Sequence, residues 1–197
     1  ILVTFIQVLT CSFAAYGFTK CKFRGRDTLF LCYIATIAIP WQIYMLPQYS
    51  MMQKLGLVDT HLGYVLMQAF AAFGVFLLRQ FYQSVPDELI EAARIDGLSE
   101  YGSYFRIVLP LAKPAIATLT IFTFVTIWND FMGPMIYFNS EANKTIPLGI
   151  RMFIGQYSSE YQLIMAASVV ALLPVLILYV FCQRFFVQGI ATSGLKG

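Results

Sequence analysis

Half of the acidic residues of this chain are gathered in one short segment, which makes that segment the first candidate for chemistry. The sequence has ten Asp and Glu residues, and half of them lie within residues 79–113. Carboxylates grouped in this way can bind basic side chains of another protein through charge-assisted hydrogen bonds. A separate acid, Asp130, lies inside a long apolar stretch, where an ionisable residue usually faces a polar cavity or a partner.

Other reactive groupings are missing from the sequence. His61 is the only histidine, so a histidine-based metal cluster is not expected. The four cysteines form no C-x-x-C pair and predict neither a zinc site nor a structural disulfide: they are Cys11, Cys21, Cys32 and Cys182. Gly97 and Gly102 have the spacing of a phosphate-binding loop, but Ser103 stands where a lysine is needed. We therefore expect no catalytic residue, metal or cofactor, and any nucleotide hydrolysis must occur in another chain.

The composition indicates a membrane protein. Apolar residues make up 59% of the 197 residues and charged residues 12%, with a mean hydropathy of +0.71, against roughly 45–50% and ~25% in soluble domains. A chain of this length has too little interior to bury so much apolar surface. A soluble enzyme, a disordered segment and a nucleic-acid-binding module are excluded, despite the net charge of +3.

Five stretches are apolar enough to cross a bilayer, and each is close to the ~20 residues that a spanning helix needs. Helices are expected because lipid cannot satisfy free backbone groups. The first stretch lacks the basic start and cleavage site of a signal peptide, so we expect another helix to precede it and six in the intact chain. The fold class is therefore an all-α polytopic membrane protein, with five spans at residues 1–18, 28–49, 61–78, 114–138 and 161–183.

Basic residues favour one side of these spans. Ten of the 13 Lys and Arg residues fall in residues 19–27, in residues 79–113 and at the C-terminus. By the positive-inside rule this side is cytoplasmic, which places the C-terminus in the cytoplasm.

Residues 79–113, here called the hairpin segment, read as two short helices. Ser84 and Asp87 have capping-box spacing, with Pro86 in the first turn. Gly97 is placed to end the first helix, and Ser99 starts a second that is expected to reach about Arg106. The apolar stripe of the first helix is Leu89, Ile90 and Ala93, and the chain is expected to break at Pro110 and Pro114. An alternative is a solvated hairpin lying on the membrane surface.

The hairpin segment also carries a spaced motif: Glu91, Ala92 and Ala93, then Gly97, then Ile107, Leu109 and Pro110. This pattern resembles the EAA loop of binding-protein-dependent ABC importer permeases. The words VPDEL (residues 85–89), RIDG (94–97), WNDF (128–131) and GIATSGLKG (189–197) are similar to the maltose-type carbohydrate permeases. The resemblance covers residues 1–197 as one transmembrane domain, with residues 79–113 as its cytoplasmic coupling loop.

The resemblance implies a permease subunit of an ATP-driven importer in a bacterial or archaeal cell membrane. The expected partners are a second permease, two ATPase subunits that bind ATP and Mg, and an extracytoplasmic binding protein that delivers a carbohydrate. The hairpin would insert into the ATPase, with coupling residues Glu91, Ala92, Ala93, Asp96, Gly97, Ile107, Leu109 and Pro110. By the same resemblance, a tail of Gly194, Leu195, Lys196 and Gly197 reaches the ATPases, the alternative being a frayed end.

Asp130 and Asn129 are candidates for the transport path, with Gly133 and Pro134 breaking the helix just after them. Asp130 could instead cap that break or lie in the headgroup layer. Four glutamines within the spans are weaker candidates, since such residues often join helices: they are Gln7, Gln42, Gln48 and Gln68. Residues 139–160, with Gly149 and Gly155, form a loop long enough to contact a binding protein or to be an ordinary surface loop.

Two other classes of membrane protein remain as alternatives. An ion-driven secondary transporter usually has paired intramembrane charges and internal repeats, whereas this sequence has one such acid and no evident repeat. A membrane enzyme would need a constellation of reactive side chains in the spans. A permease for a solute other than a sugar also remains possible.

Overall fold

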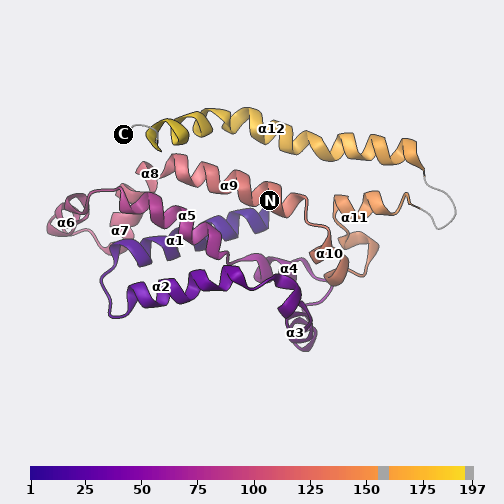
Figure 1. Cartoon of the computed structure of the whole chain (residues 1–197), viewed down its shortest axis with the longest axis horizontal. Coiled ribbons are helices and arrows are strands. Elements are labelled where there is room, and N and C mark those ends of the chain that lie inside the picture. The colour runs from indigo at the N-terminus through magenta and orange to yellow at the C-terminus, as the bar shows by residue number, and fades with distance from the viewer. Residues whose placement is uncertain (155–159, 194–197) are drawn as a thin grey trace.

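The chain folds into a bundle of helices, most of which run along one direction (Figure 1). The computed structural model describes residues 1–154 and 160–193, with side chains described as far as Phe181. The longer helices are α1 (Leu2–Lys20), α2 (Arg26–Ala35), α3 (Trp41–Lys54), α4 (His61–Gln68), α5 (Ala72–Gln83), α6 (Asp87–Ile95), α9 (Lys113–Trp128) and α12 (Tyr161–Ser193). The shorter ones are η1 (Thr36–Ala38), α7 (Glu100–Ser103), the π-helical turn η2 (Tyr104–Val108), α8 (Leu109–Leu111), α10 (Met132–Tyr137), η3 (Glu141–Asn143) and α11 (Ile146–Arg151).

Helix α1 is the centre of the bundle. It packs against α2, α4, α5 and α9, while α12 packs on α9 and α11. Cys11 and Ala15 of α1 lie in a buried cluster with Leu78 of α5 and Leu119 of α9. α5 approaches α1 closely at Gly74, where a Cβ atom would lie 2.8 Å from Cys11 Sγ and 3.2 Å from Leu119 Cδ1.

Among the described residues, two helices are long and apolar enough to cross a membrane singly, and up to five spans result if each bent pair counts as one. The all-α fold is confirmed, but three of the predicted spans are not single helices. The second bends by 100° between η1 and α3, and the third by 47° between α4 and α5. At the bend between η1 and α3, Ile39 adopts an extended conformation, because Pro40 disfavours the helical region for the residue before it.

The fourth predicted span is also interrupted, but not where expected. α9 ends at Trp128, and Gly133 and Pro134 lie inside the short helix α10 instead of breaking the chain. Proline is tolerated there because the first turn of a helix needs no N–H donor. The break falls at residues 129–131, before these two residues.

The break between α4 and α5 is stabilised by side chains of α1. Gln7 Nε2 donates to the Gln68 carbonyl at 2.8 Å, the Thr10 hydroxyl donates to the Ala69 carbonyl, and Cys11 Sγ donates to the Ala71 carbonyl at 3.3 Å. In a lipid environment backbone groups freed by a helix break need such partners. Gln7 therefore joins α1 to α4, a role that glutamines within spans often have.

The two turns predicted for the hairpin segment are confirmed. Gly97 has a φ of +80°, a conformation that favours glycine. Leu98 N donates to Ala93 O at 2.9 Å and Gly97 N to Arg94 O at 3.1 Å, which together form the Schellman motif that ends α6. Ser99 Oγ accepts a hydrogen bond from Gly102 N and caps the second arm.

The prediction that Ser84 caps the start of α6 is wrong. The Ser84 hydroxyl donates to the Phe81 carbonyl at 2.7 Å, so it closes the end of α5 and does not cap α6. The predicted stripe is also partly wrong, because Leu89 is 44% exposed while Ile90 and Ala93 are buried.

The second arm is longer than predicted. Helical structure continues past Arg106 through η2 and α8, and Pro110 lies inside α8. The bend comes at Ala112, where the arm and α9 meet at 80°. Pro114 falls in the first turn of α9, where its missing N–H leaves no bond unmade.

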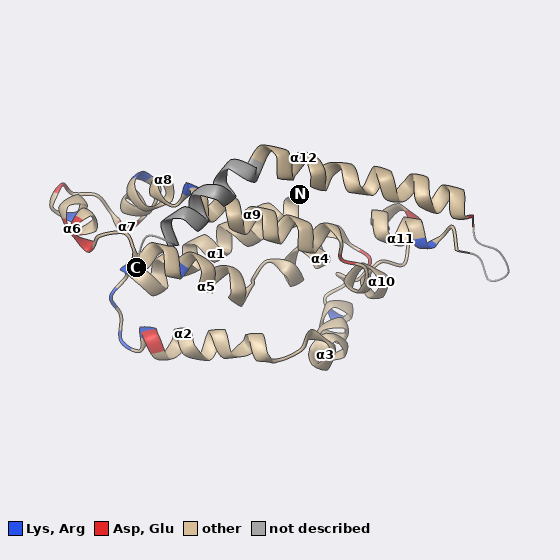
Figure 2. Ribbon diagram, turned by 45° about the horizontal axis from the view of Figure 1, so that its top comes forward, with Lys and Arg blue, Asp and Glu red and all other residues tan. Residues whose placement is uncertain are grey.

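Charged side chains lie at the two ends of the bundle, and the helices between are almost free of them (Figure 2). We call the end that carries α6, α7 and α8 the hairpin end, and the end that carries α3, α4, α10 and α11 the far end (Figure 1). This distribution is the one expected of a protein whose middle is surrounded by lipid.

The close contact at Gly74 predicts that Gly74→Ala destabilises the bundle by about 1–3 kcal/mol, since overpacking forces the neighbouring helices apart. Gly17→Ala is the matched control, because a Cβ atom at Gly17 meets nothing within 4 Å. It should be neutral or stabilising by up to ~1 kcal/mol through helix propensity. Unfolding of the purified variants in detergent measures both, and equal effects would contradict the close packing.

Candidate functional site

The hairpin segment is held to the last turn of α1 by a buried lysine. The Lys20 side chain is 3% exposed, and its Nζ donates to the Val85 carbonyl and to Asp87 Oδ1, each at 2.6 Å. A buried ammonium needs such partners, because its charge loses the solvation of water. Lys20 thus attaches the first turn of α6 to the central helix.

A second contact attaches the turn between the two arms of the hairpin. Arg94 Nε donates to Glu100 Oε1 at 2.8 Å, and the Tyr16 hydroxyl of α1 donates to Glu100 Oε2 at 2.9 Å. Arg94 also reaches the Lys20 carbonyl at 3.4 Å. Since both arms are bonded to α1, the hairpin and α1 are expected to move together.

Buried hydroxyls continue this connection into the bundle. Ser12 Oγ lies 2.6 Å from the Tyr82 hydroxyl and 2.7 Å from the Tyr104 hydroxyl. These three residues come from α1, α5 and η2, and all are buried. The second arm is therefore joined to the core by packing and by polar contacts.

The EAA-type residues divide between the surface and the core. Glu91 and Ala92 are exposed, whereas Ala93 is buried. Ile107 and Leu109 are half-buried and pack against the core cluster. The exposed coupling candidates are therefore Glu91, Ala92, Asp96, Gly97 and Pro110.

The hairpin also exposes apolar side chains that the motif did not include. Ile95 is 86% exposed, Tyr101 is 71% exposed and Leu89 is 44% exposed. A group of exposed apolar side chains on an otherwise polar segment is a candidate interaction surface. Of the three, only Ile95 is an apolar residue of α6 outside its predicted stripe, which is a signal that the sequence contains. The hairpin surface, defined as these three residues with Glu91 and Ala92, is one candidate site.

A polar cavity of about 430 Å³ at the far end is the other candidate. Gln42, Gln68 and Asp130, predicted separately from the sequence, all line it. Asn129 does not: it is exposed, and its Nδ2 donates to the Val125 carbonyl at 2.8 Å. Gln48, another glutamine predicted from the sequence, also lines the cavity, and the remaining lining residues are Trp41, Tyr44, Tyr64, Met67, Phe70, Thr126, Ile127, Met132, Gly133 and Tyr137.

Asp130 both caps a turn and lines the cavity. Its Oδ1 accepts from Gly133 N at 3.1 Å, and its Oδ2 accepts from the Tyr64 hydroxyl at 2.6 Å. Gln48 Oε1 accepts from Trp41 Nε1 at 2.9 Å and from the Tyr137 hydroxyl at 3.4 Å. Amide, hydroxyl and carboxylate groups beside aromatic rings are well suited to binding polyhydroxylated molecules.

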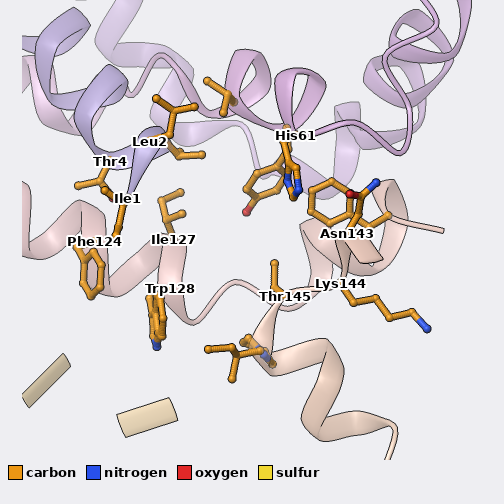
Figure 3. A pocket seen from close by; sticks show the side chains of 16 residues that line it. Ile1, Leu2, Thr4, His61, Phe124, Ile127, Trp128, Asn143, Lys144 and Thr145 are labelled. Atoms are coloured by element: carbon orange, nitrogen blue, oxygen red, sulfur yellow. The ribbon is translucent and has the colours of Figure 1, made fainter. Parts of the chain in front are cut away.

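A larger cavity nearby is apolar. It has a volume of about 530 Å³ and is lined by the start of α1, the end of α9 and residues 143–147. In Figure 3 the Lys144 side chain points away from the other labelled side chains. Thr4 Oγ1 and Thr145 Oγ1 are buried without a hydrogen-bond partner. Most of the lining of this cavity is apolar, so it suits a polar ligand less well than the first cavity does.

Asp59 ties the described part of the 139–160 loop to the connection between α3 and α4. Its Oδ1 accepts from Asn139 N at 3.0 Å and from Ser140 N at 3.1 Å, and Asn143 Nδ2 donates to the Asp59 carbonyl at 2.7 Å. Residue Gly155 of this loop and the tail Gly194–Gly197 lie outside the described residues. Within the described part of the chain, no group of three or more His, Cys, Asp or Glu side chains could hold a metal.

Comparison with known proteins yields one family and several relatives. Residues 7–192 match the family model described as binding-protein-dependent transport system inner membrane component. The arabinooligosaccharides transport system permease protein AraQ of Halalkalibacterium halodurans is 36% identical over 197 residues, covering 100% of this chain and 71% of that protein. The lactose transport system permease protein LacG of Rhizobium radiobacter is 33% identical over 190 residues, covering 96% and 70%.

A solved structure has the same fold. It is a crystal structure of a bacterial ABC transporter involved in the import of the acidic polysaccharide alginate. The TM-score is 0.81 at 25% identity, and the alignment covers 94% of this chain and 70% of that one.

The buried position of Lys20 predicts that Lys20→Met releases the hairpin from α1. Leaving the Val85 carbonyl buried without its partner should destabilise the attachment by about 1–3 kcal/mol. Hydrogen exchange of residues 85–103 should then quicken by tenfold or more. Lys22→Met is the control, because Lys22 is exposed, and it should change exchange by less than twofold.

The two ion pairs predict a dependence on pH. The hydrogen bond from Lys20 lowers the pKa of the Asp87 carboxyl, and the hydrogen bond from Arg94 lowers the pKa of Glu100. Because both folded-state values lie below the unfolded values of about 4, the stabilisation is complete above pH ~4 and is lost as the pH falls further.

The Asp87→Asn/Glu100→Gln double variant should therefore unfold more easily than the wild type at pH 6, by about 1 kcal/mol since both carboxylates are partly exposed. The difference should shrink toward zero below pH ~3.5. Unfolding curves at the two pH values measure it, and an equal difference at both would contradict the role of these charges.

Proposed function

Because the chain belongs to the family of binding-protein-dependent transport system inner membrane components, we propose that it is the carbohydrate permease of an ATP-driven importer. One observation carries the proposal. Gln68, which lines the polar cavity at the far end, and Asp87 of the hairpin segment at the opposite end are both hydrogen-bonded to the same helix, α1. This is the arrangement required to couple an energy-supplying partner at one end to solute passage at the other.

The hairpin end is the cytoplasmic side in this proposal. The clustering of basic residues near the hairpin supports it by the positive-inside rule. The C-terminus is then also cytoplasmic. ATP and Mg are bound by two separate ATPase subunits, which supply the energy that this chain does not.

The hairpin surface is the ATPase contact. Glu91 forms no ion pair within the described structure and is free to bind a basic residue of the partner. Ile95, Tyr101 and Leu89 would provide the apolar area around that pair, which excludes water and strengthens it. Ala93, Ile107 and Leu109 contribute by shaping the hairpin from within, and Gly97 sets the angle between its arms. Gly194–Gly197 would extend the contact to the ATPases.

Movement of the ATPases reaches the cavity through α1. The hairpin is bonded to α1 at Tyr16 and Lys20, and α1 is bonded at Gln7 to the carbonyl of Gln68, a residue that lines the cavity. ATP binding that favours one tilt of the hairpin therefore favours one state of the cavity. The energy transferred is limited to the difference in ATP affinity between the two states.

The polar cavity lies on the carbohydrate path, with Gln42, Gln68 and Asp130 in its wall. The names of the relatives include neutral sugars and an acidic polysaccharide, so they support carbohydrate without defining its charge. The 139–160 loop would contact the binding protein that delivers the sugar. A second, related permease would complete the path, since one chain forms only part of a channel wall.

Reconstitution of the complete complex in liposomes tests this function. Uptake of a panel containing arabinotriose, lactose, trigalacturonate and trimannuronate should require both ATP and the binding protein. Uptake by this chain alone, driven by a proton or sodium gradient, would instead support a secondary transporter. A search for non-sugar solutes would follow if no member of the panel is taken up.

Charge reversal of the hairpin surface should uncouple the complex. Glu91→Arg is expected to reduce ATP hydrolysis stimulated by the loaded binding protein by at least ~10-fold, because a buried interfacial charge loses its partner. Lys54→Glu, a charge reversal at the exposed end of α3, is the matched control and should retain stimulation. Full stimulation and normal ATPase co-purification of the Glu91→Arg complex would refute the contact.

A further inference from the structure

The polar cavity contains one charge and it is negative. Asp130 is the only acidic residue that lines it, and its described lining includes no Lys, Arg or His. The basic residues of the far end lie elsewhere: Lys54 ends α3, Arg151 ends α11 and Lys144 lines the neighbouring apolar cavity. A solute entering the cavity therefore meets a carboxylate with no compensating cation in the wall.

Asp130 is fixed in place and oriented to accept hydrogen bonds. Tyr64 and Gly133 each donate to one of its oxygens, so each oxygen keeps a further lone pair for a ligand. Tyr64 and Asp130 are joined across 66 residues of sequence, and this contact links α4 to the start of α10. The carboxylate therefore cannot turn away from the cavity without breaking two bonds.

The other polar groups of the wall are neutral and can both donate and accept. The Gln42 side chain is exposed and forms no hydrogen bond within the described structure, and the same holds for the side chains of Tyr44 and Thr126. Gln48 accepts two hydrogen bonds on its oxygen, which leaves its amide N–H groups free. Sugar hydroxyls match such groups, since a hydroxyl also donates and accepts.

We propose that this cavity binds uncharged saccharide units and that Asp130 selects against uronic acids. The inference rests on the proposed carbohydrate function and adds the charge class of the substrate. A sugar hydroxyl can donate to Asp130, whereas a uronate carboxylate has no proton to donate and is repelled. Because part of the surrounding wall is apolar, water screens this repulsion less than at an open surface.

The electrostatic potential in the cavity can be tested without any substrate, from the rates at which charged thiol reagents modify a cysteine placed there. In the assembled transporter, with Cys21, Cys32 and Cys182 replaced by serine, Gln42→Cys is treated with a cationic and an anionic methanethiosulfonate. Ser50→Cys is the control, since Ser50 is exposed on the same helix and does not line the cavity. Relative to this control, the cationic reagent should react with Gln42→Cys about tenfold faster than the anionic reagent, as expected for one negative charge in the same cavity.

Asp130→Asn should bring that preference close to the control value. Equal preferences at Gln42→Cys and Ser50→Cys, or a preference unchanged by Asp130→Asn, would overturn the proposal. Gln42→Glu and Gln42→Lys provide a second route that does not disturb the Asp130 turn. They should shift the uptake ratio of neutral to acidic trisaccharide in opposite directions, several-fold each, whereas a loss of folding would lower both rates alike.

Saccharide protection gives the substrate class directly. A millimolar concentration of the neutral sugar that the complex takes up should slow modification of Gln42→Cys by an uncharged methanethiosulfonate, and trigalacturonate should not. Protection by both, or by neither while ATP-driven uptake of the neutral sugar proceeds, would overturn this inference and leave the carbohydrate function standing. Absence of ATP-driven uptake for every sugar would instead refute the proposed function itself.

Discussion

Hydrogen bonds from α1 to the interrupted helix α4–α5 are the constraint on which the rest of this structure depends. A helix break exposes carbonyl groups, and lipid offers them no donor. Gln7, Thr10 and Cys11 supply those donors from one face of α1. The interruption can therefore persist within an apolar bundle, and it turns Gln68 toward the polar cavity.

Helix α1 also holds the hairpin, at its C-terminal end. Tyr16 and Lys20 hold both arms of the hairpin, and the core of α1 packs tightly on α5 and α9. Since close-packed interiors transmit displacement instead of absorbing it, one rigid element connects the hairpin surface to the cavity wall. The hairpin that exposes the apolar residues and the cavity residue Gln68 are therefore both attached to α1.

Much of the fold could be predicted because its signals are local. Apolar stretches of suitable length predicted helices, and Gly97 and Ser99 predicted turns, since each depends on residues within one turn of helix. Predictions failed where local signals competed. Ser84 could close α5 or cap α6, and Leu89 could face either way on a short helix. Tertiary contacts decided both cases.

The sequence by itself determined that this is a helical membrane protein, that half of its acidic residues lie in one hairpin, and that it resembles an importer permease. Only the tertiary structure decided which polar residues meet. Gln7 reaches Gln68, Lys20 reaches Asp87 and Tyr64 reaches Asp130 across 61, 67 and 66 residues of chain. Such pairs depend on helix crossing and on the bends between helices. Hydropathy and capping patterns describe one helix at a time, so they contain no information on how helices cross or on the bends between them.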